Sequence, residues 1–286
     1  MKRRIITAIV AIMIFAPICI FSEYIILPIA MGILALFGVY EISKCMGVHK
    51  ELGLTIPIYL VALALPTLRY FLSGKTKPNS VFLLYAMACA FLIVVYALVY
   101  VMFSKNKYKL SDALTLVSLS VYVIGCFVAV VMVRYTDTVP NQGIVMFPVI
   151  FLSAWICDTF AYFTGKFFGK HKLIPEISPK KTVEGAIGGI IFTFLTLIAY
   201  GCLIKFAFKI NDISFVHFII LGLVLPVVSQ VGDLIASCIK RQYNVKDFGN
   251  VFPGHGGVLD RFDSPMLVAP FLCLTNAIVF CFKDLI

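Results

Sequence analysis

Nine apolar runs, most of them about 20 residues long, divide this sequence and constrain its fold more than any other feature. An α-helix rises 1.5 Å per residue, so about 20 residues cross the roughly 30 Å hydrocarbon core of a bilayer. The chain is 61% hydrophobic and 13% charged, whereas soluble domains contain about 45–50% apolar residues. We therefore expect an all-α, polytopic integral membrane protein of about nine transmembrane helices. The expected spans are 5–22, 24–40, 52–71, 81–103, 113–133, 144–165, 184–206, 214–236 and 265–282.

The basic residues between these runs predict the orientation of the chain. If the N-terminus is cytoplasmic, the segments 41–51, 104–112, 166–183 and 237–264 share its side, and this side carries 17 of the 24 Lys and Arg residues. Such an excess is typical of cytoplasmic loops. The basic start and apolar body of the first run are typical of a signal peptide, but no small-x-small cleavage site follows, so we expect an uncleaved helix.

Composition also excludes several classes of protein. The net charge of +10 is distributed over short loops between apolar runs, which argues against nucleic acid as a partner. The nine cysteines are scattered without a CxxC pair, so neither a disulfide framework nor a zinc site is indicated. No Walker A or GxGxxG motif is present. We expect one membrane domain over 1–286, with generic helices over 1–150 and the catalytic region over 151–286.

The second half of the chain differs from the first, because polar residues enter the membrane-embedded runs themselves. Asp233 lies in or at the end of an apolar helix, where an ionised side chain costs at least ~2.5–3.5 kcal/mol. Helical spacing places Gln230, Asp233, Ser237 and Lys240 on one face, so we expect a polar stripe that points into a shared cavity. The alternative is a purely structural ion pair between Asp233 and a lysine.

A second polar cluster occupies residues 155–189. Asp158 and Tyr162 are four residues apart, on one face of the sixth expected helix. Ser178 and Thr182 are candidate caps of the next helix, whose free N-terminus next to lysines would bind an anion such as phosphate. The alternative is an ordinary basic loop before a capped helix. The lysines of this cluster are Lys166, Lys170, Lys172, Lys180 and Lys181.

The third cluster is SCIKRQYNVKDFGNVFPGHGGVLDRFD, residues 237–263. Its Gly-rich turn around His255 allows backbone N–H groups to approach a ligand closely. Asp260 and Asp263 follow on one face of the next helix, and such carboxylates suit Mg²⁺, which combines one or two of them with phosphate oxygens and water. The alternatives are a histidine without a role and a self-neutralising solvated loop. Together the three clusters favour a site for a nucleoside triphosphate with Mg²⁺. We therefore expect a polar active-site cavity that faces the cytoplasm.

The third cluster resembles the signature of the phosphatidate cytidylyltransferase family, also called CDP-diacylglycerol synthases, at about a dozen positions. DTFAYFTGKFFGKHKL, SPKKTVEG and GDLIAS are similar to the same family, so the resemblance covers residues 155–263. It implies the reaction CTP + phosphatidic acid → CDP-diacylglycerol + pyrophosphate. It also implies a bacterial-type inner membrane, with the N-terminus and active site in the cytoplasm, and it leaves a homodimer open.

The resemblance also implies roles for individual residues. The metal ligands would be Asp233 and Asp260 first, then Asp263 and Asp158, for Mg²⁺ and an optional second monovalent or divalent cation. The catalytic group would be Lys180, Lys181, Ser237, Lys240, Arg241, Lys246, His255 and Arg261, whose basic members hold the phosphates of CTP and lipid. Substrate binding would involve Ser178, Thr182, Asp158, Tyr162, Asp247, Gly256 and Gly257, with backbone donors in the Gly-rich turn.

Two other functions remain open from the sequence. A CTP-dependent polyprenol or phytol kinase would share the lipid, the nucleotide and the membrane, but would transfer the γ-phosphoryl group and release CDP. A secondary transporter would use intramembrane Asp and Lys to carry ions or substrate. Transporters are often built from paired halves, whereas the polar residues here gather in one half of the chain.

Overall fold

The computed structural model describes residues 10, 13–72, 79–104, 109–136, 140–210, 213–252 and 256–283. Among these residues, seven helical segments are long and apolar enough to cross a membrane. The chain is therefore an all-α integral membrane protein, as predicted. The first expected span, 5–22, lies partly outside the described residues, so the count of nine spans stays a prediction.

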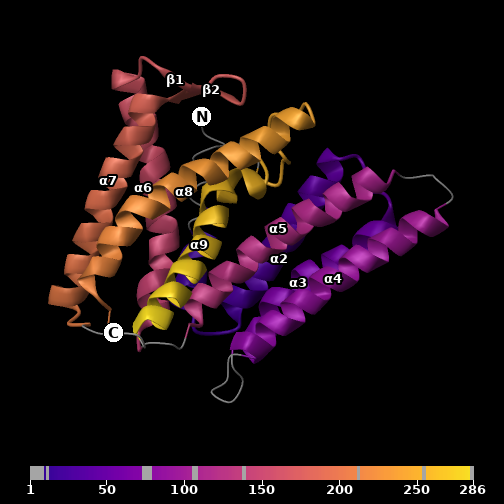
Figure 1. Ribbon diagram of the computed structural model, residues 1–286, viewed down its shortest axis with the longest axis horizontal. Coiled ribbons are helices and arrows are strands. Elements are labelled where there is room, and N and C mark those ends of the chain that lie inside the picture. The colour runs from indigo at the N-terminus through magenta and orange to yellow at the C-terminus, as the bar shows by residue number, and fades with distance from the viewer. Residues whose placement is uncertain are drawn as a thin grey trace. The chain divides into compact units, whose positions relative to one another are not determined.

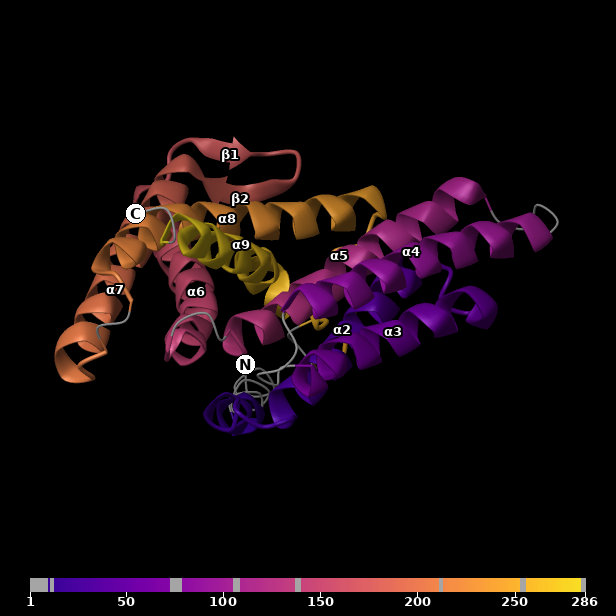
Figure 2. The ribbon, with the colours of Figure 1, turned by 60° about the horizontal axis from the view of Figure 1, so that its bottom comes forward.

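The chain forms two compact units, of which the first comprises Met1–Val131 and Tyr243–Arg261. Helix α2 packs against α3, and α3 packs against α4, as Figures 1 and 2 both show. The expected single membrane domain, with its division at residue 150, stays a prediction. The helices that contribute to this unit are α2 (Ile26–Cys45), α3 (Leu52–Phe71), α4 (Asn79–Phe103) and most of α5 (Leu110–Arg134).

The outer face of α4 shows why this unit belongs in a bilayer. Leu84, Met87 and Phe91 are 68%, 69% and 67% exposed, and their spacing of three and four residues places them on one side of the helix. In water such a continuous apolar face would be a large unpartnered patch. In lipid it is solvated by acyl chains.

Three connecting segments that were predicted to share one side of the membrane meet within this first unit. Burial raises the pKa of the Tyr243 hydroxyl, and its neighbours Cys45 and Asp112 raise it further. Cys45 in turn interacts electrostatically with Asp260. Cys45, Asp112, Tyr243 and Asp260 therefore lie near one another in the first unit, as the placement of their segments on one side requires.

The second unit comprises Met132–Gln242 and Phe262–Ile286. Helices α6, α7 and α8 pack against one another, and the strands β1 and β2 lie beyond one end of α6 and α7 (Figure 1). The elements of this unit are α6 (Gln142–Phe168), β1 (Lys172–Ile174), β2 (Ser178–Thr182), α7 (Val183–Cys202), the π-helical turn η1 (Leu203–Ala207), α8 (Phe215–Gln242) and most of α9 (Leu259–Lys283).

The antiparallel hairpin β1–β2 is the feature that the sequence did not predict. Lys172 pairs with Thr182, and Ile174 pairs with Ser178. Ser178 therefore begins a strand, and its prediction as a helix cap is wrong because α7 begins only at Val183. The pairing converts an expected basic loop into a short rigid element that ends directly at the first turn of α7.

Glycine allows the close contact between α6 and α7. A Cβ atom on Gly188 would lie 2.3 Å from Thr164 Oγ1, so no larger residue fits while the helices keep this separation. Lipid supplies no hydrophobic force between helices, and small residues stabilise such contacts through close packing. The glycines at the start of α7 thus hold it against α6, which carries Asp158.

Candidate functional site

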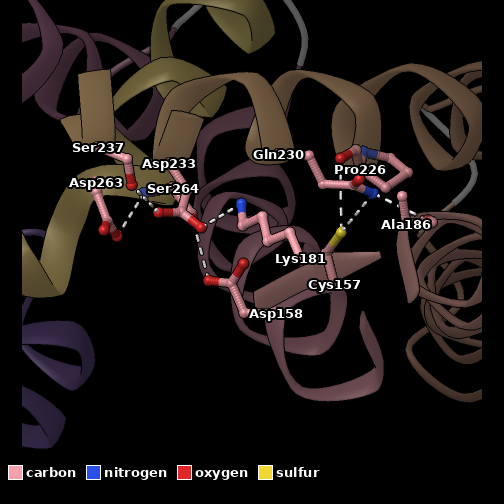
Figure 3. Close-up of polar contacts among 10 residues, drawn as sticks. All are labelled: Cys157, Asp158, Lys181, Ala186, Pro226, Gln230, Asp233, Ser237, Asp263 and Ser264. Carbon is pink, nitrogen blue, oxygen red and sulfur yellow. Dashed lines mark hydrogen bonds and ion pairs between the residues drawn. The ribbon is translucent and has the colours of Figure 1, made fainter. Parts of the chain in front are cut away.

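The polar stripe predicted on α8 faces the neighbouring helices of the second unit (Figure 3). Gln230 Nε2 donates to the carbonyl oxygen of Ala186 at 3.0 Å and contacts Cys157 Sγ at 3.4 Å. One helical turn further on, the Ser237 hydroxyl lies 3.5 Å from Asp233 Oδ1. Gln230, Asp233 and Lys240 therefore contact or interact with other elements of this unit, as one inward face of α8 requires, while the shared cavity stays a prediction.

Three half-buried carboxylates come together beside this stripe, from three different helices. Asp158 of α6 accepts a hydrogen bond from Ser264 Oγ at 2.9 Å, and Asp263 of α9 accepts one from the Ser264 backbone N–H at 2.9 Å. Asp233 of α8 interacts electrostatically with both carboxylates. Three like charges this close repel one another, so the cluster is suited to a cation.

Two lysines supply part of the opposite charge. Lys181 Nζ forms an ion pair with Asp233, in which the two side chains are 26% and 23% exposed. Lys240 interacts electrostatically with Asp263. Three carboxylates therefore lie beside two ammonium groups. The alternative of a purely structural pair between Asp233 and one lysine does not account for Asp158 and Asp263.

The donor set fits a magnesium ion that arrives with a nucleotide. No group of three or more His, Cys, Asp or Glu side chains among the described residues is arranged to hold a metal ion by itself. Mg²⁺ seldom uses such a cage, because it keeps several waters and binds one or two carboxylates together with substrate phosphates. Asp158, Asp233 and Asp263 provide hard oxygen ligands of the required kind.

The start of α7 differs in part from the prediction. Thr182 caps the helix, since its Oγ1 accepts a hydrogen bond from Gly185 N–H at 3.1 Å. The Val183 N–H donates to the His171 carbonyl at 3.0 Å, and the Glu184 carboxylate lies in the first turn. The prediction of a free helix N-terminus for an anion is therefore wrong, because its donors are engaged and an acidic side chain lies beside them.

The hairpin nevertheless carries basic side chains toward the site. Lys181 reaches Asp233, whereas Lys180, its neighbour on β2, is exposed. Arg241 Nε donates to the Ile177 carbonyl at 3.3 Å, which ties the end of α8 to the turn of the hairpin. Tyr162 is 63% exposed, and its ring contacts Phe163.

The remaining signature residues belong to the first unit, in or next to the signature loop, residues 243–258. Lys246, Asp247 and Arg261 are exposed. Asp260 is buried, and its Oδ2 accepts hydrogen bonds from the N–H groups of Phe248 at 2.8 Å and Gly257 at 2.9 Å. The role of Asp260 as a metal ligand stays a prediction.

The Gly-rich turn is also used differently from the prediction. The N–H of Gly257 donates to Asp260, so this glycine does not offer a free donor to a substrate. Gly256 has a φ of +86°, a conformation in which residues with a Cβ are strained. Its carbonyl accepts from Phe252 N–H at 2.9 Å. His255 lies outside the described residues, and its role stays a prediction.

Sequence reasoning missed two residues that organise these contacts. Ser264 joins Asp158 to Asp263, and no sequence pattern distinguishes it from other serines. Glu41 of α2 accepts hydrogen bonds from the N–H groups of Val258 at 2.8 Å and Leu259 at 3.0 Å. A sequence signal for Glu41 did exist, because a carboxylate at the end of an apolar run is costly unless something compensates for it.

Apolar spans that surround clustered carboxylates and lysines define a polytopic α-helical membrane protein with a charged site between its helices. The chain belongs to the cytidylyltransferase family, whose model matches residues 2–279. It is 34% identical over 274 residues to a Bacillus subtilis (strain 168) protein named phosphatidate cytidylyltransferase, covering 95% of this chain and 96% of that protein. A Staphylococcus aureus (strain COL) protein of the same name is 36% identical over 278 residues, with 95% and 97% covered.

Proposed function

We propose that this chain is a phosphatidate cytidylyltransferase, which converts CTP and phosphatidic acid into CDP-diacylglycerol and pyrophosphate. The relatives that carry this name match nearly the whole chain. The observation that carries the proposal is the cluster of Asp158, Asp233 and Asp263 with Lys181 inside an otherwise apolar unit. A site with carboxylates for a cation and ammonium groups for phosphate suits a reaction between two phosphate-bearing substrates.

The reaction requires alignment and charge neutralisation more than a protein nucleophile. An oxygen of the lipid phosphate attacks the α-phosphorus of CTP, the bond from that phosphorus to the bridging oxygen breaks, and pyrophosphate leaves. Lys181 and Lys240 would offset the negative charge that accumulates on the phosphates. Arg241, which is tethered to the hairpin turn, and the exposed Lys180 would extend this basic surface.

We further propose Mg²⁺ as the cofactor, bound by one or two of the carboxylates Asp158, Asp233 and Asp263 together with substrate phosphates and water. Bound Mg²⁺ would neutralise phosphate charge and orient the leaving group. Ser264 donates to Asp158 through its hydroxyl and to Asp263 through its backbone, so it would orient two of these three candidate ligands. Asp260 as a further ligand and a second cation remain predictions.

The decisive experiment follows the two ends of the nucleotide separately. Purified protein in lipid–detergent micelles is incubated with Mg²⁺, phosphatidic acid and CTP that carries label at either the α- or the γ-phosphate. A cytidylyltransferase places the α-label in the lipid and the γ-label in pyrophosphate. Transfer of the γ-label to a polyprenol or phytol with release of CDP would instead identify a kinase. No lipid labelling, in a preparation where a related enzyme is active, would refute the proposal.

We propose a bacterial-type inner membrane with the N-terminus and the site on the cytoplasmic side. The distribution of Lys and Arg supports this orientation, and the relatives are bacterial. A protease site inserted at 175–177 in the hairpin turn should be cut in inverted membrane vesicles and protected in spheroplasts; the reverse pattern would contradict it. Cross-linking in the same vesicles would test the predicted homodimer.

A further inference from the structure

Glu41 is a buried carboxylate that the proposed chemistry does not use. It lies near the end of α2, is 1% exposed, and binds the backbone of a segment 217 residues later in the chain. Its Oε1 accepts from Val258 N–H at 2.8 Å, and its Oε2 accepts from Leu259 N–H at 3.0 Å. Both carboxylate oxygens are thus engaged where the signature loop enters α9.

The charge of Glu41 suits this position. Leu259 begins α9, and the first N–H groups of a helix have no partner in their own helix and carry partial positive charge. A carboxylate that accepts two of them satisfies donors that would otherwise be costly to bury. Lys44, one turn later on α2, also interacts favourably with Glu41.

Asp260 makes the matching contacts from inside the loop region. Its Oδ2 accepts from the N–H groups of Phe248 and Gly257, so two carboxylates together bind four backbone N–H groups of the loop and the start of α9. Hydrogen bonds to charged acceptors are about twice as strong as neutral ones. The backbone around Gly257 is therefore held from both sides.

Two glycines of the signature leave the space that the Glu41 carboxylate occupies. A Cβ atom on Gly257 would lie 2.3 Å from Glu41 Oε1, and one on Gly249 would lie 2.6 Å from the same atom. Glu41 cannot move aside without losing its hydrogen bonds to Val258 and Leu259. Gly249 and Gly257 must therefore lack a side chain, because the Glu41 side chain of α2 occupies the space that a Cβ atom would need.

We propose that Glu41 is a positioning residue, which holds the backbone at Val258 and Leu259 so that Arg261 reaches the substrate phosphates. The proposal rests on the proposed function for the task of Arg261. Glu41 itself touches neither substrate nor cation. The N-terminal helices thereby contribute to catalysis through the loop.

A double-mutant cycle separates positioning from general stabilisation. Glu41→Gln keeps the size of the side chain but presents an NH₂ group to one of the two N–H donors, and we expect kcat/KM to fall about 10- to 100-fold. In an Arg261→Gln background the same change should cost less than about threefold, because the guanidinium group that Glu41 is proposed to position is then absent. If the two losses multiply, Glu41 does not act through Arg261 and the proposal is overturned.

Hydrogen exchange tests the contact independently of the reaction. In Glu41→Gln, exchange at the amides of Val258 and Leu259 should become at least about tenfold faster, while α6, α7 and α8 keep their protection. Glu23→Gln makes the same change at an exposed glutamate and should leave exchange and turnover unchanged. Unaltered exchange at Val258 and Leu259 would overturn the proposal, whatever the activity. A wild-type protein without cytidylyl transfer would instead refute the proposed function.

Gly249→Ala provides a second route if Glu41→Gln does not accumulate. Its methyl group would press on the Glu41 carboxylate from the loop side, so it should reproduce the faster exchange at Val258 and Leu259. It should also reproduce the non-additivity with Arg261→Gln. Normal exchange at both amides in this variant would count against the proposal in the same way.

Discussion

Replacing Asp233 by Asn should separate activity from stability. The change removes one negative charge and preserves the shape of the side chain. It also removes the ion pair with Lys181, whose side chain is 26% exposed. Because both side chains are only about a quarter exposed, loss of this pair by itself would cost on the order of 1–3 kcal/mol.

The loss of that pair is offset within the same cluster. Asp233 interacts electrostatically with Asp158 and Asp263, so its neutralisation relieves repulsion of a similar magnitude. Lys181 also keeps Asp158 as an electrostatic partner. We therefore expect the free energy of unfolding to change by less than about 1 kcal/mol. Loss of a carboxylate that binds Mg²⁺, whose charge stabilises the transition state, should lower kcat/KM by at least about 100-fold, which corresponds to about 2.7 kcal/mol.

The assay is cytidylyl transfer measured over a Mg²⁺ titration, with thermal unfolding in detergent measured in parallel. Asp112→Asn makes the same change at an exposed aspartate at the start of α5 and should behave like the wild type. Near-normal kcat/KM of Asp233→Asn at every Mg²⁺ concentration would remove Asp233 from the metal site. A decrease of several kcal/mol in the free energy of unfolding of Asp233→Asn would show that the charges do not offset one another.

Three further outcomes follow from the same contacts. Lys181→Met keeps the aliphatic stem but leaves Asp233 without its partner, so kcat/KM should fall about 10- to 100-fold and the apparent affinity for CTP should drop in a substrate titration. Gly188→Ala places a methyl group against Thr164 and should lower the free energy of unfolding by about 1–3 kcal/mol, measured by thermal unfolding in detergent. Thr182→Ala removes the cap of α7 and should cost about 1 kcal/mol by the same measurement.

Each of these changes has a matched control. Lys50→Met alters an exposed lysine between α2 and α3 and should preserve turnover; wild-type activity of Lys181→Met would contradict its role. A Cβ on Gly125 would meet no atom within 4 Å, so Gly125→Ala should not lower the free energy of unfolding. Equal effects of Gly125→Ala and Gly188→Ala would show that close packing against Thr164 is not the cause. The Thr196 hydroxyl donates to the Phe192 carbonyl within α7. Thr196→Ala should therefore lower the free energy of unfolding less than Thr182→Ala does. The reverse order would contradict the role of Thr182 as a helix cap.

Local patterns predicted much of this protein because the forces behind them act over a few residues. Span length follows from bilayer thickness, so the ends of the helices between residues 26 and 242 were predicted to within about six residues. The shared face of Gln230, Asp233 and Ser237 follows from helical periodicity alone. The cap by Thr182 requires only a hydroxyl three residues before an N–H donor. The signature at 237–263 indicated the family before any contact was known.

The contacts between distant segments were decided only by the tertiary structure. Strand pairing engaged Ser178, and hydrogen bonds inside the loop engaged the N–H of Gly257, although the sequence had predicted other roles for both. Periodicity states which residues share a face of one helix, but the neighbour of that face depends on close packing among all helices. For this reason the sequence alone determined a membrane cytidylyltransferase with charged residues in its helices. Only the packed structure joined Asp158, Asp233 and Asp263, and only it placed Glu41 against a loop 217 residues away.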